Sequence, residues 1–555
     1  MVRATFSGFN TALSALQANQ KRLDITGQNL SNMNTAGYTR QQLEASSLNY
    51  TNPVSHYSNG NETAVGFGVS MDRVSQIRDP YLDIQYRSQS ADCSYTNRLQ
   101  TALNSLSKVL DETTISGIRQ AFDDIQSTLT SMQDPAKVSD PIYESELRTK
   151  MQSVCNLFNQ ASRQITQAEQ NEFQRLTGEG SSEQGDVQKI NDILRQIGDL
   201  NVQIKRNQVA GHPSLELQDE RNLLLDELSG YIPVETRYYK DDAHSGNNAY
   251  DYDANGAVIG KKDWPDDLEV SMNYIDAQGK SQKLILVNGS DLGADGLTKN
   301  YGQLSVLNRD HQPAASVSDP ANISIKFEKA PSYQVNGQAA TDVYAELKGI
   351  HFEGGSLQAS LDMLQKKGTG NVINGSVDDV RGYQYYSEKL DQLADTFAKS
   401  MNASNNGNNH KDQNLLSNST DDSTTGITAG NIGISKGWTS GTIHISTDGT
   451  NRTDTILDMI AAMKDTKKLN GKTFADYMNN LSTQLASDSS SNQTALKTGT
   501  TVLNSIQDSR DSLSGVSLDE EATNMMAYVS AYNAASRLMT ALDEVLNTLI
   551  SNTGA

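Results

Sequence analysis

The sequence predicts a mainly α-helical protein with an inserted β-rich domain, assembled from discontinuous segments of one chain. Three observations support this fold class. Apolar residues recur at seven-residue steps near both ends of the chain, a pattern typical of coiled-coil helices. Several inner segments show the three- and four-residue spacing of amphipathic helices. Residues 231–350 are instead rich in Gly, Asn, Asp and Tyr and contain short alternating apolar runs.

The first helix is expected near the N-terminus, where four apolar residues follow one another at seven-residue steps: Phe9, Leu16, Leu23 and Leu30. Phe6 and Leu13 precede two of them by three residues and supply the other apolar heptad position. Gln20 and Gly27 interrupt this second series. The pattern indicates a helix with one apolar seam.

The last helix is expected to begin at Leu518. The acidic residues 519–521 favour a helix start, because they face its free amide groups and the positive end of its dipole. Two apolar series follow, three residues apart: Met525, Tyr532, Met539 and Leu546, and then Tyr528, Ala535, Leu542 and Leu549. Heptads at both extreme ends are unusual in a globular enzyme, because helix ends fray there most easily.

Between the ends, five segments show helical spacing and predict long helices that pack side by side: 99–110, 118–132, 147–158, 190–204 and 386–397. Within 231–350, the runs 268–272 and 283–287 alternate as strands do, and Asn-Gly pairs at 255, 288 and 336 mark turns. Helical spacing resumes at Leu357. A small β patch is expected at 427–446, after a polar loop at 402–425.

These patterns predict three domains. Residues 1–45 and 515–555 are expected to form a terminal coiled-coil domain. Residues 46–230 and 351–514 are expected to form an inner helical bundle that includes the small β patch. Residues 231–350 are expected to form an outer β-rich insert.

Composition excludes several functional classes. The chain of 555 residues carries 46 basic and 67 acidic residues, a net charge of −21, which argues against binding nucleic acid or anionic lipid. No apolar run approaches the length of a membrane span, and the start lacks the features of a cleaved signal peptide. These features indicate a soluble protein that stays in the cytoplasm or is exported without a cleaved signal.

No catalytic or metal-binding motif was found, and the seven histidines are scattered singly. Asp251, Asp253, Asn255 and Gly256 resemble the opening of a calcium loop, but the position of its last ligand holds Lys262, so a β-hairpin is the better interpretation. Cys93 and Cys155 are expected to be small buried side chains. The sequence therefore indicates no catalytic residue, no metal and no cofactor, in a protein that is not an enzyme.

Four stretches resemble the family of flagellar axial proteins, which includes rod, hook and hook-associated proteins. Residues 29–38, NLSNMNTAGY, look like the family's N-terminal signature, and residues 514–550 look like its C-terminal end. Residues 217–228, LQDERNLLLDEL, and the segment beginning at 354 resemble the hook-associated members in particular. The resemblance covers both ends and most of the helical layer, and it is weak over 231–350.

The resemblance implies a structural subunit that joins hook to filament and assembles as a ring of identical copies at the hook tip. It also implies export through the flagellar type III apparatus, contact with the hook protein and a second hook-associated protein, and an export chaperone at the C-terminal region. The terminal seams of a lone subunit are then expected to be mobile and to be buried by neighbours. The residues expected to contact neighbouring subunits are Phe9, Leu13, Leu16, Leu23, Asn29, Leu30, Asn32, Asn34, Thr35, Gly37, Tyr38, Leu518, Met525, Tyr528, Tyr532, Met539, Leu542, Leu546 and Leu549.

Alternatives remain at this stage. An ordinary two-helix core within one chain predicts the same apolar seams. The chain also fits another axial subunit, such as the hook protein or a distal rod protein. A third alternative is a secreted adhesin whose β-rich insert binds carbohydrate through tyrosines and Trp264.

Overall fold

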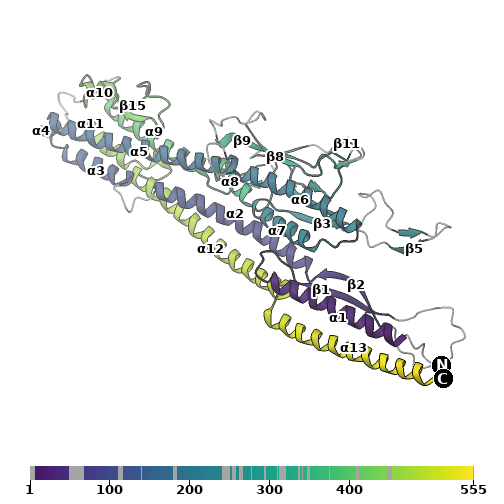
Figure 1. The fold of residues 1–555 in the computed structure, drawn as a ribbon. Helices are drawn as coiled ribbons and strands as arrows, with labels where there is room; N and C mark the ends of the chain where they lie inside the picture. Colours follow the sequence, from purple (N-terminus) through teal and green to yellow (C-terminus); the bar gives the residue numbers. More distant parts are fainter. Residues whose placement is uncertain are drawn as a thin grey trace.

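The computed structural model is an elongated molecule, with both chain ends at one tip and the β-rich part along one side (Figure 1). It is mainly helical with small antiparallel sheets, as the sequence predicts. The structure describes residues 7–48, 68–110, 117–138, 140–178, 184–239, 250–252, 258–261, 267–276, 278–292, 296–308, 311, 320–335, 338–339, 342–346, 350–373, 376–407, 412–446 and 453–553.

The two expected terminal helices form and lie side by side at one tip of the molecule (Figure 1). They are α1 (Ser7–Ser31) and α13 (Leu518–Thr553), and they run in opposite directions. A hairpin of β1 (Gln41–Ser47) and β2 (Val69–Gln76) packs along α1. The sequence analysis did not predict this hairpin, because its strands are too polar to show a clear alternation.

A bundle of long helices forms the middle of the molecule. Two of the longest, α2 (Pro80–Leu110) and α12 (Phe474–Ser514), run antiparallel along its length. Around them lie α3 (Ile118–Ser131), α5 (Pro141–Thr177), α6 (Asp186–Val209), α7 (Leu215–Tyr231), α8 (Ser356–Gln365), α9 (Tyr383–Asn405) and α11 (Asp454–Lys464), with the short α4 (Pro135–Val138) and α10 (Lys436–Ser440). Four of the five helical segments predicted from spacing fall within these helices, and the fifth, 118–132, extends one residue beyond the end of α3.

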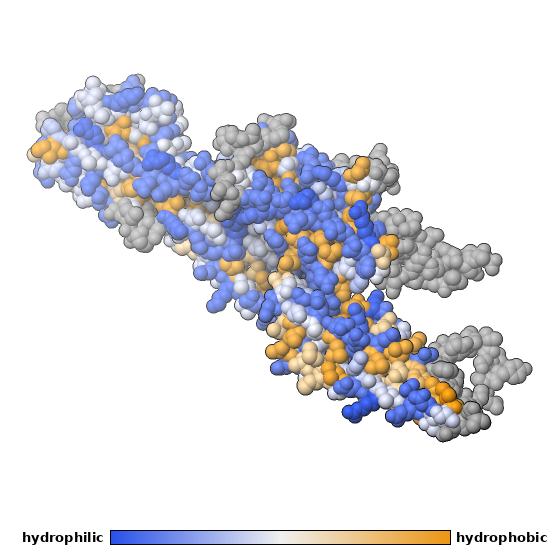
Figure 2. Space-filling model, in the orientation of Figure 1, coloured by the Kyte–Doolittle hydropathy of each residue, from blue (hydrophilic) through white to orange (hydrophobic). Residues whose placement is uncertain are grey.

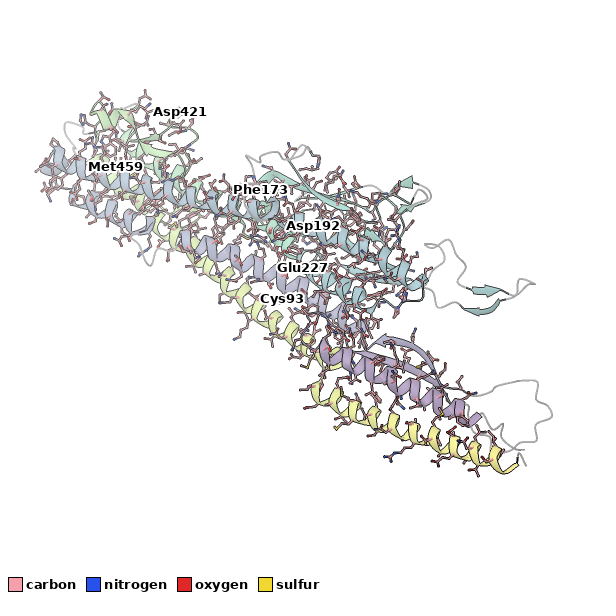
Figure 3. The ribbon with its side chains drawn as sticks, viewed as in Figure 1. Cys93, Phe173, Asp192, Glu227, Asp421 and Met459 are labelled. Carbon is pink, nitrogen blue, oxygen red and sulfur yellow. The ribbon has the colours of Figure 1, made fainter. Side chains whose placement is uncertain are left out.

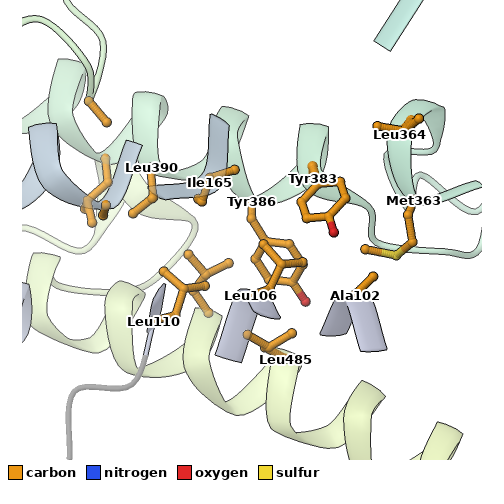
Figure 4. Close-up of a cluster of buried hydrophobic side chains, with 14 of the residues drawn as sticks. Ala102, Leu106, Leu110, Ile165, Met363, Leu364, Tyr383, Tyr386, Leu390 and Leu485 are labelled. Atoms are coloured by element: carbon orange, nitrogen blue, oxygen red, sulfur yellow. The ribbon is translucent and has the colours of Figure 1, made fainter. Parts of the chain in front are cut away.

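Local residues explain how the helices of the bundle begin and end. The Asp140 side chain accepts a hydrogen bond from the Ile142 amide at the start of α5, where Pro141 occupies the first turn. Gly178 ends the same helix in the left-handed conformation that glycine tolerates. The interior is a continuous cluster of aliphatic and aromatic side chains, including Leu106 and Tyr386 (Figure 4). Cys93 and Cys155 are buried free thiols in this bundle, as predicted.

The insert contains two three-stranded antiparallel sheets, as expected of a β-rich region. One has the order β3 (Glu235–Tyr239), β6 (Asp267–Ile275), β7 (Ser281–Asn288), and the other β12 (Val343–Ala345), β9 (Ile323–Glu328), β8 (Gln303–Asn308). Two-stranded pairs join β4 (Tyr250–Tyr252) to β5 (Val258–Lys261) and β10 (Gln334–Val335) to β11 (Gln338–Ala339). The β4–β5 pair confirms the predicted hairpin strands, while the turn residues 253–257 lie outside the described part of the chain.

The predicted β patch at 427–446 is partly wrong. Only β16 (Ile432–Ile434) is a strand there, and residues 436–440 form α10. Its partner β15 (Leu416–Asn418) lies in the stretch predicted as a loop. The buried Asn402 side chain holds this strand, because its amide bonds the backbone of Leu415 and Leu416. A further two-residue pair, β13 (Val372–Ile373) with β14 (Ser376–Val377), precedes α9.

The division into three domains stays a prediction. The predicted boundary at residue 46 cuts the β1–β2 hairpin, whose strands pair across it. A boundary near residue 78, where the chain leaves β2 and enters α2, keeps the hairpin with α1.

Candidate functional site

The candidate site is the terminal helical pair, α1 and α13, together with the hairpin and the joint that connects them to the bundle. Across the pair, α1 and α13 approach closely: a Cβ added to Gly8 would lie 3.3 Å from a methyl carbon of Leu542. Arg22 lies over the ring of Tyr528, 5.7 Å from its centroid. Nine of the predicted contact residues on α1 and α13 are half-buried: Phe9, Leu16, Leu23, Leu30, Met525, Tyr528, Met539, Leu542 and Leu546.

α13 leaves many large apolar side chains exposed to solvent. Three predicted contact residues of α13 are exposed, Leu518, Tyr532 and Leu549, and Leu13 of α1 is exposed as well. Five further exposed residues on α13 were not predicted: Met526, Val529, Leu538, Val545 and Ile550. Among the described residues, the only buried apolar side chain of α13 is that of Ala535. The space-filling view shows hydrophobic surface gathered over this tip (Figure 2).

α1 is better covered than α13, because the hairpin packs on it from a second side. Its buried residues include Ala12, Ala18 and Ile25, which lie outside the predicted seam. Ser14 Oγ accepts a hydrogen bond from the Val69 amide, 3.2 Å away, and so fixes the start of β2 against the helix. The heptad pattern alone does not reveal these positions, because the hairpin is contributed by tertiary structure.

The first and last residues of the signature segment 29–38, Asn29 and Tyr38, form hydrogen bonds within the chain. Asn29 is buried, and its amide group bonds both the N–H and the C=O of Gln41, each at 3.0 Å. The Tyr38 hydroxyl donates to Asn29 Oδ1 over 2.9 Å. Asn29 was predicted to contact neighbouring subunits, but in this structure its polar atoms are used to anchor β1.

The other signature residues are more accessible. Asn34, Thr35 and Gly37 are exposed, and Asn32 and Tyr38 are half-buried. Gly37 has a positive φ of 77°, which lets the segment turn back towards the hairpin. The role of these residues in subunit contact stays a prediction.

A chain of six alternating charges lies at the joint between the terminal helices and the bundle; we call it the charge chain. Ion pairs link its members in the order Asp219, Arg78, Asp83, Arg510, Asp226 and Arg87. No member has a side chain more than 17% exposed. The charge chain draws its members from α7, α2, α12 and the segment between β2 and α2, so it fixes where these elements meet.

Three contacts fasten the terminal unit to the start of α7. The Thr39 N–H donates to Asp219 Oδ2 over 3.1 Å, and Gln76 Nε2 donates to the Leu215 carbonyl over 2.9 Å. Gln41 Nε2 donates to Glu216 Oε1 over 3.4 Å. Asp219 and Asp226 belong to the 217–228 motif, so the sequence contained a signal for this joint that the predicted contact set left out.

Burial raises the pKa of the Asp219 carboxyl to about 6, and the negative charge of Glu216 acts in the same direction. The hydrogen bonds from Thr39 and the charge of Arg78 partly oppose this shift. Burial and the charge of Asp219 also raise the pKa of the Tyr38 hydroxyl. The Asp219 carboxyl therefore titrates closer to neutral pH than an ordinary carboxyl does.

Two other classes of site were searched in the described residues. No three or more His, Cys, Asp or Glu side chains gather there as they do around a metal ion. None of the helices described is both long enough and apolar enough to span a membrane. Figure 3 shows the single labelled thiol, Cys93, within the bundle on α2, away from the terminal pair.

Comparison with known proteins agrees with this geometry at both ends of the chain. A family model of the flagellar hook-associated protein FlgK helical domain matches residues 103–262. Models of the flagella basal body rod protein and of the flagellar basal body rod FlgEFG protein C-terminal region match residues 9–39 and 509–552. Flagellar hook-associated protein 1 of Bacillus subtilis is 29% identical, with 99% of each chain aligned. Over nearly its whole length the chain is similar to the flagellar hook-associated proteins.

Other members of the family are more distant. Flagellar hook-associated protein 1 of Escherichia coli is 23% identical over 98% of this chain and 99% of its own. A solved structure of the flagellar hook junction protein FlgK from Burkholderia pseudomallei is 19% identical, covers 60% of this chain and 44% of its own, and has a TM-score of 0.38. The first hook-associated protein is the member that the full-length matches name, which favours it over a hook or rod subunit and over an adhesin.

Proposed function

We propose that the chain is a structural subunit that joins the hook of the bacterial flagellum to the filament, and that it has no enzymatic activity. The observation that carries this proposal is the exposed apolar surface of α13, a long helix that packs mainly against α1 in the part of the chain that the structure describes. Exposed apolar surface on this scale marks a site of association. The names of the full-length relatives support an association in the hook-associated region of the flagellum.

A second apolar row on α13 supports contact with a neighbouring subunit. Its members recur at steps of three and four residues on a face other than the one that meets α1: Ala527, Ala531, Ala534, Leu538, Ala541 and Val545. Five of the six are exposed, and only Ala531 is half-buried. Heptad spacing suits a helical partner, and alanines permit close approach of that partner. We assign this row to contact with a second copy in a ring.

The remaining partners follow from the family. They are the hook protein, a second hook-associated protein and an export chaperone at the C-terminal region, with export through the flagellar type III apparatus. The expected mobility of α1 and α13 in the free monomer belongs to the same proposal. Amide exchange of the isolated chain tests it, because slow exchange along both helices would contradict mobility.

The proposal is tested by complementing a deletion strain with a variant of the second row, Leu538→Glu with Val545→Glu. Both side chains are exposed, so the monomer should keep its helix content by circular dichroism. Charges in a buried subunit interface are costly, so the cells should carry hooks without filaments, lose filament protein to the medium and fail to swim.

The matched control is Thr540→Glu with Asn547→Glu. It adds the same charge to the same helix with the same separation, on exposed polar positions outside the second row. The control strain should swim. Equal swimming of both strains would refute the contact surface, and finding the wild-type protein away from the hook–filament boundary in purified flagella would refute the junction role itself.

A further inference from the structure

The charge chain ends at Asp219, and this end is held less firmly than the rest. Asp226 lies 2.8 Å from Arg87 and 2.7 Å from Arg510, whereas the nearest cation to Asp219 is Arg78, 3.9 Å away. Asp219 Oδ1 is buried and has no hydrogen-bond partner in the part of the chain that the structure describes. A buried carboxylate oxygen without a donor is costly while it is charged.

Asp219 lies where the terminal unit rests on the bundle. The chain crosses between the two parts covalently at residues 77–79 and 515–517. The contacts of Thr39, Gln41 and Gln76 described above form a third connection, on the first turns of α7. Since the covalent crossings are short segments outside helices and strands, this third connection contributes to how firmly the terminal unit is held, together with the hydrogen bond from the Arg40 N–H to the Ser514 carbonyl.

We propose that Asp219 is a positioning residue that makes the joint sensitive to pH, so that protonation of its carboxyl tightens the terminal helical pair against the bundle. When the joint is closed, the carboxyl is buried against the segment that follows α1. When the joint opens, the carboxyl meets water.

The sign follows from proton linkage. The closed joint raises the pKa of Asp219 to about 6, whereas a carboxyl in water keeps its ordinary pKa near 4. The closed state therefore holds the proton more tightly, and lowering the pH from 8 to 5 favours it. The two pKa values differ by about two units, so the shift in the opening equilibrium reaches at most about 100-fold.

Other polar and charged groups face Asp219 from the neighbouring elements and act on the same equilibrium. They are Arg78 from the segment before α2, Glu216 from α7 and Tyr38 from the segment after α1. Arg78 also pairs with Asp83 of α2, because Arg78 Nη2 donates a hydrogen bond to Asp83 Oδ1 over 3.1 Å. Glu521 of α13 faces Tyr38 and pairs with Arg40 at the start of β1.

The experiment measures the distance between spin labels on Gln20→Cys in α1 and Ser491→Cys in α12, in the full chain freed of its two native cysteines. Both labelled positions are exposed. The wild-type distance distribution should narrow as the pH falls from 8 to 5, with a midpoint near 6. The Asp219→Asn variant mimics the neutral carboxyl and keeps an acceptor for the Thr39 N–H. Its distance distribution should therefore be narrow at every pH.

Two further variants keep the test decisive. Glu216→Gln removes a neighbouring negative charge from an exposed position, so the midpoint should move to lower pH. The control Asp508→Asn changes an exposed carboxyl of α12 and should leave the wild-type profile unchanged. A wild-type distribution that broadens on acidification, or an Asp219→Asn profile that follows the wild type, would overturn the proposal. Because the readout uses the monomer, failure here leaves the junction role untouched.

Discussion

Asp226→Ala is the sharpest test of the charge chain as a structural element. Asp226 accepts hydrogen bonds from Arg87 Nε over 2.8 Å and from Arg510 Nη2 over 2.7 Å. Arg510 keeps its pairing with Asp83, but Arg87, only 3% exposed, loses its sole ion-pair partner in the described residues. Removing one member of a buried pair leaves an uncompensated charge, which costs about 3–5 kcal/mol.

The matched control is Glu44→Ala. Glu44 pairs with Arg73 across the hairpin over 2.7 Å, but both side chains are more than a third exposed. Pairs of this kind contribute about 0–1 kcal/mol. Urea unfolding followed by circular dichroism at 222 nm should therefore separate the two variants by at least about 2 kcal/mol.

A second substitution distinguishes a stranded charge from a simple loss of packing. Asp226→Ala combined with Arg87→Met removes the unpaired cation, so the double variant should be more stable than Asp226→Ala alone. If Asp226→Ala and Glu44→Ala unfold at the same urea concentration, or if the double variant is the less stable one, the reasoning about the charge chain is wrong.

Three further predictions concern the core, the signature segment and pH. Phe122→Ala should lower the free energy of unfolding by about 3–5 kcal/mol, because the buried ring packs against three other phenylalanine rings with centroid distances of 5.1 to 6.0 Å. An unchanged melting temperature would contradict this. Asn29→Ala should cost about 1–3 kcal/mol and speed amide exchange at Gln41, because it leaves buried backbone groups unpaired. Because the pKa of Asp219 is raised to about 6, the stabilisation from its protonated carboxyl is full below about pH 4 and is lost as the pH rises through about 6. Asp219→Asn should therefore raise the free energy of unfolding by up to about 3 kcal/mol at pH 7 and by little at pH 4. Equal effects at both pH values would contradict the shift in pKa.

Periodicity made the terminal helices predictable. Apolar residues at seven-residue steps leave few alternatives to a helix, so α1 and α13 appear where the heptads do. The same argument located the inner helices, and alternation with Asn-Gly turns located the β-rich insert. Short motifs at residues 29–38 and 217–228 indicated the family, which the full-length relatives support.

Periodicity could not show which seam residues remain exposed. Leu542 and Leu538 are both apolar residues of the same helix, but Leu542 faces α1 while Leu538 faces solvent. The difference depends on where α1 and the hairpin lie, and the strands of that hairpin carry too few apolar residues to be seen in the sequence. The predicted contact set therefore missed the second row of α13.

The helical framework, the β-rich insert and the resemblance to flagellar axial proteins could all be predicted from the residues, because each depends on patterns within a few turns of chain. The joint could not be predicted in this way, because it depends on how distant segments pack. Asp83 and Arg510 are more than 400 residues apart in the sequence, with Asp219 between them. The residues next to each of them in the sequence do not distinguish it from a solvated surface charge. These side chains become buried, with acidic and basic groups in alternation, where α2, α7 and α12 converge. A buried charge is costly unless an opposite charge lies beside it, so burial makes the pairing necessary.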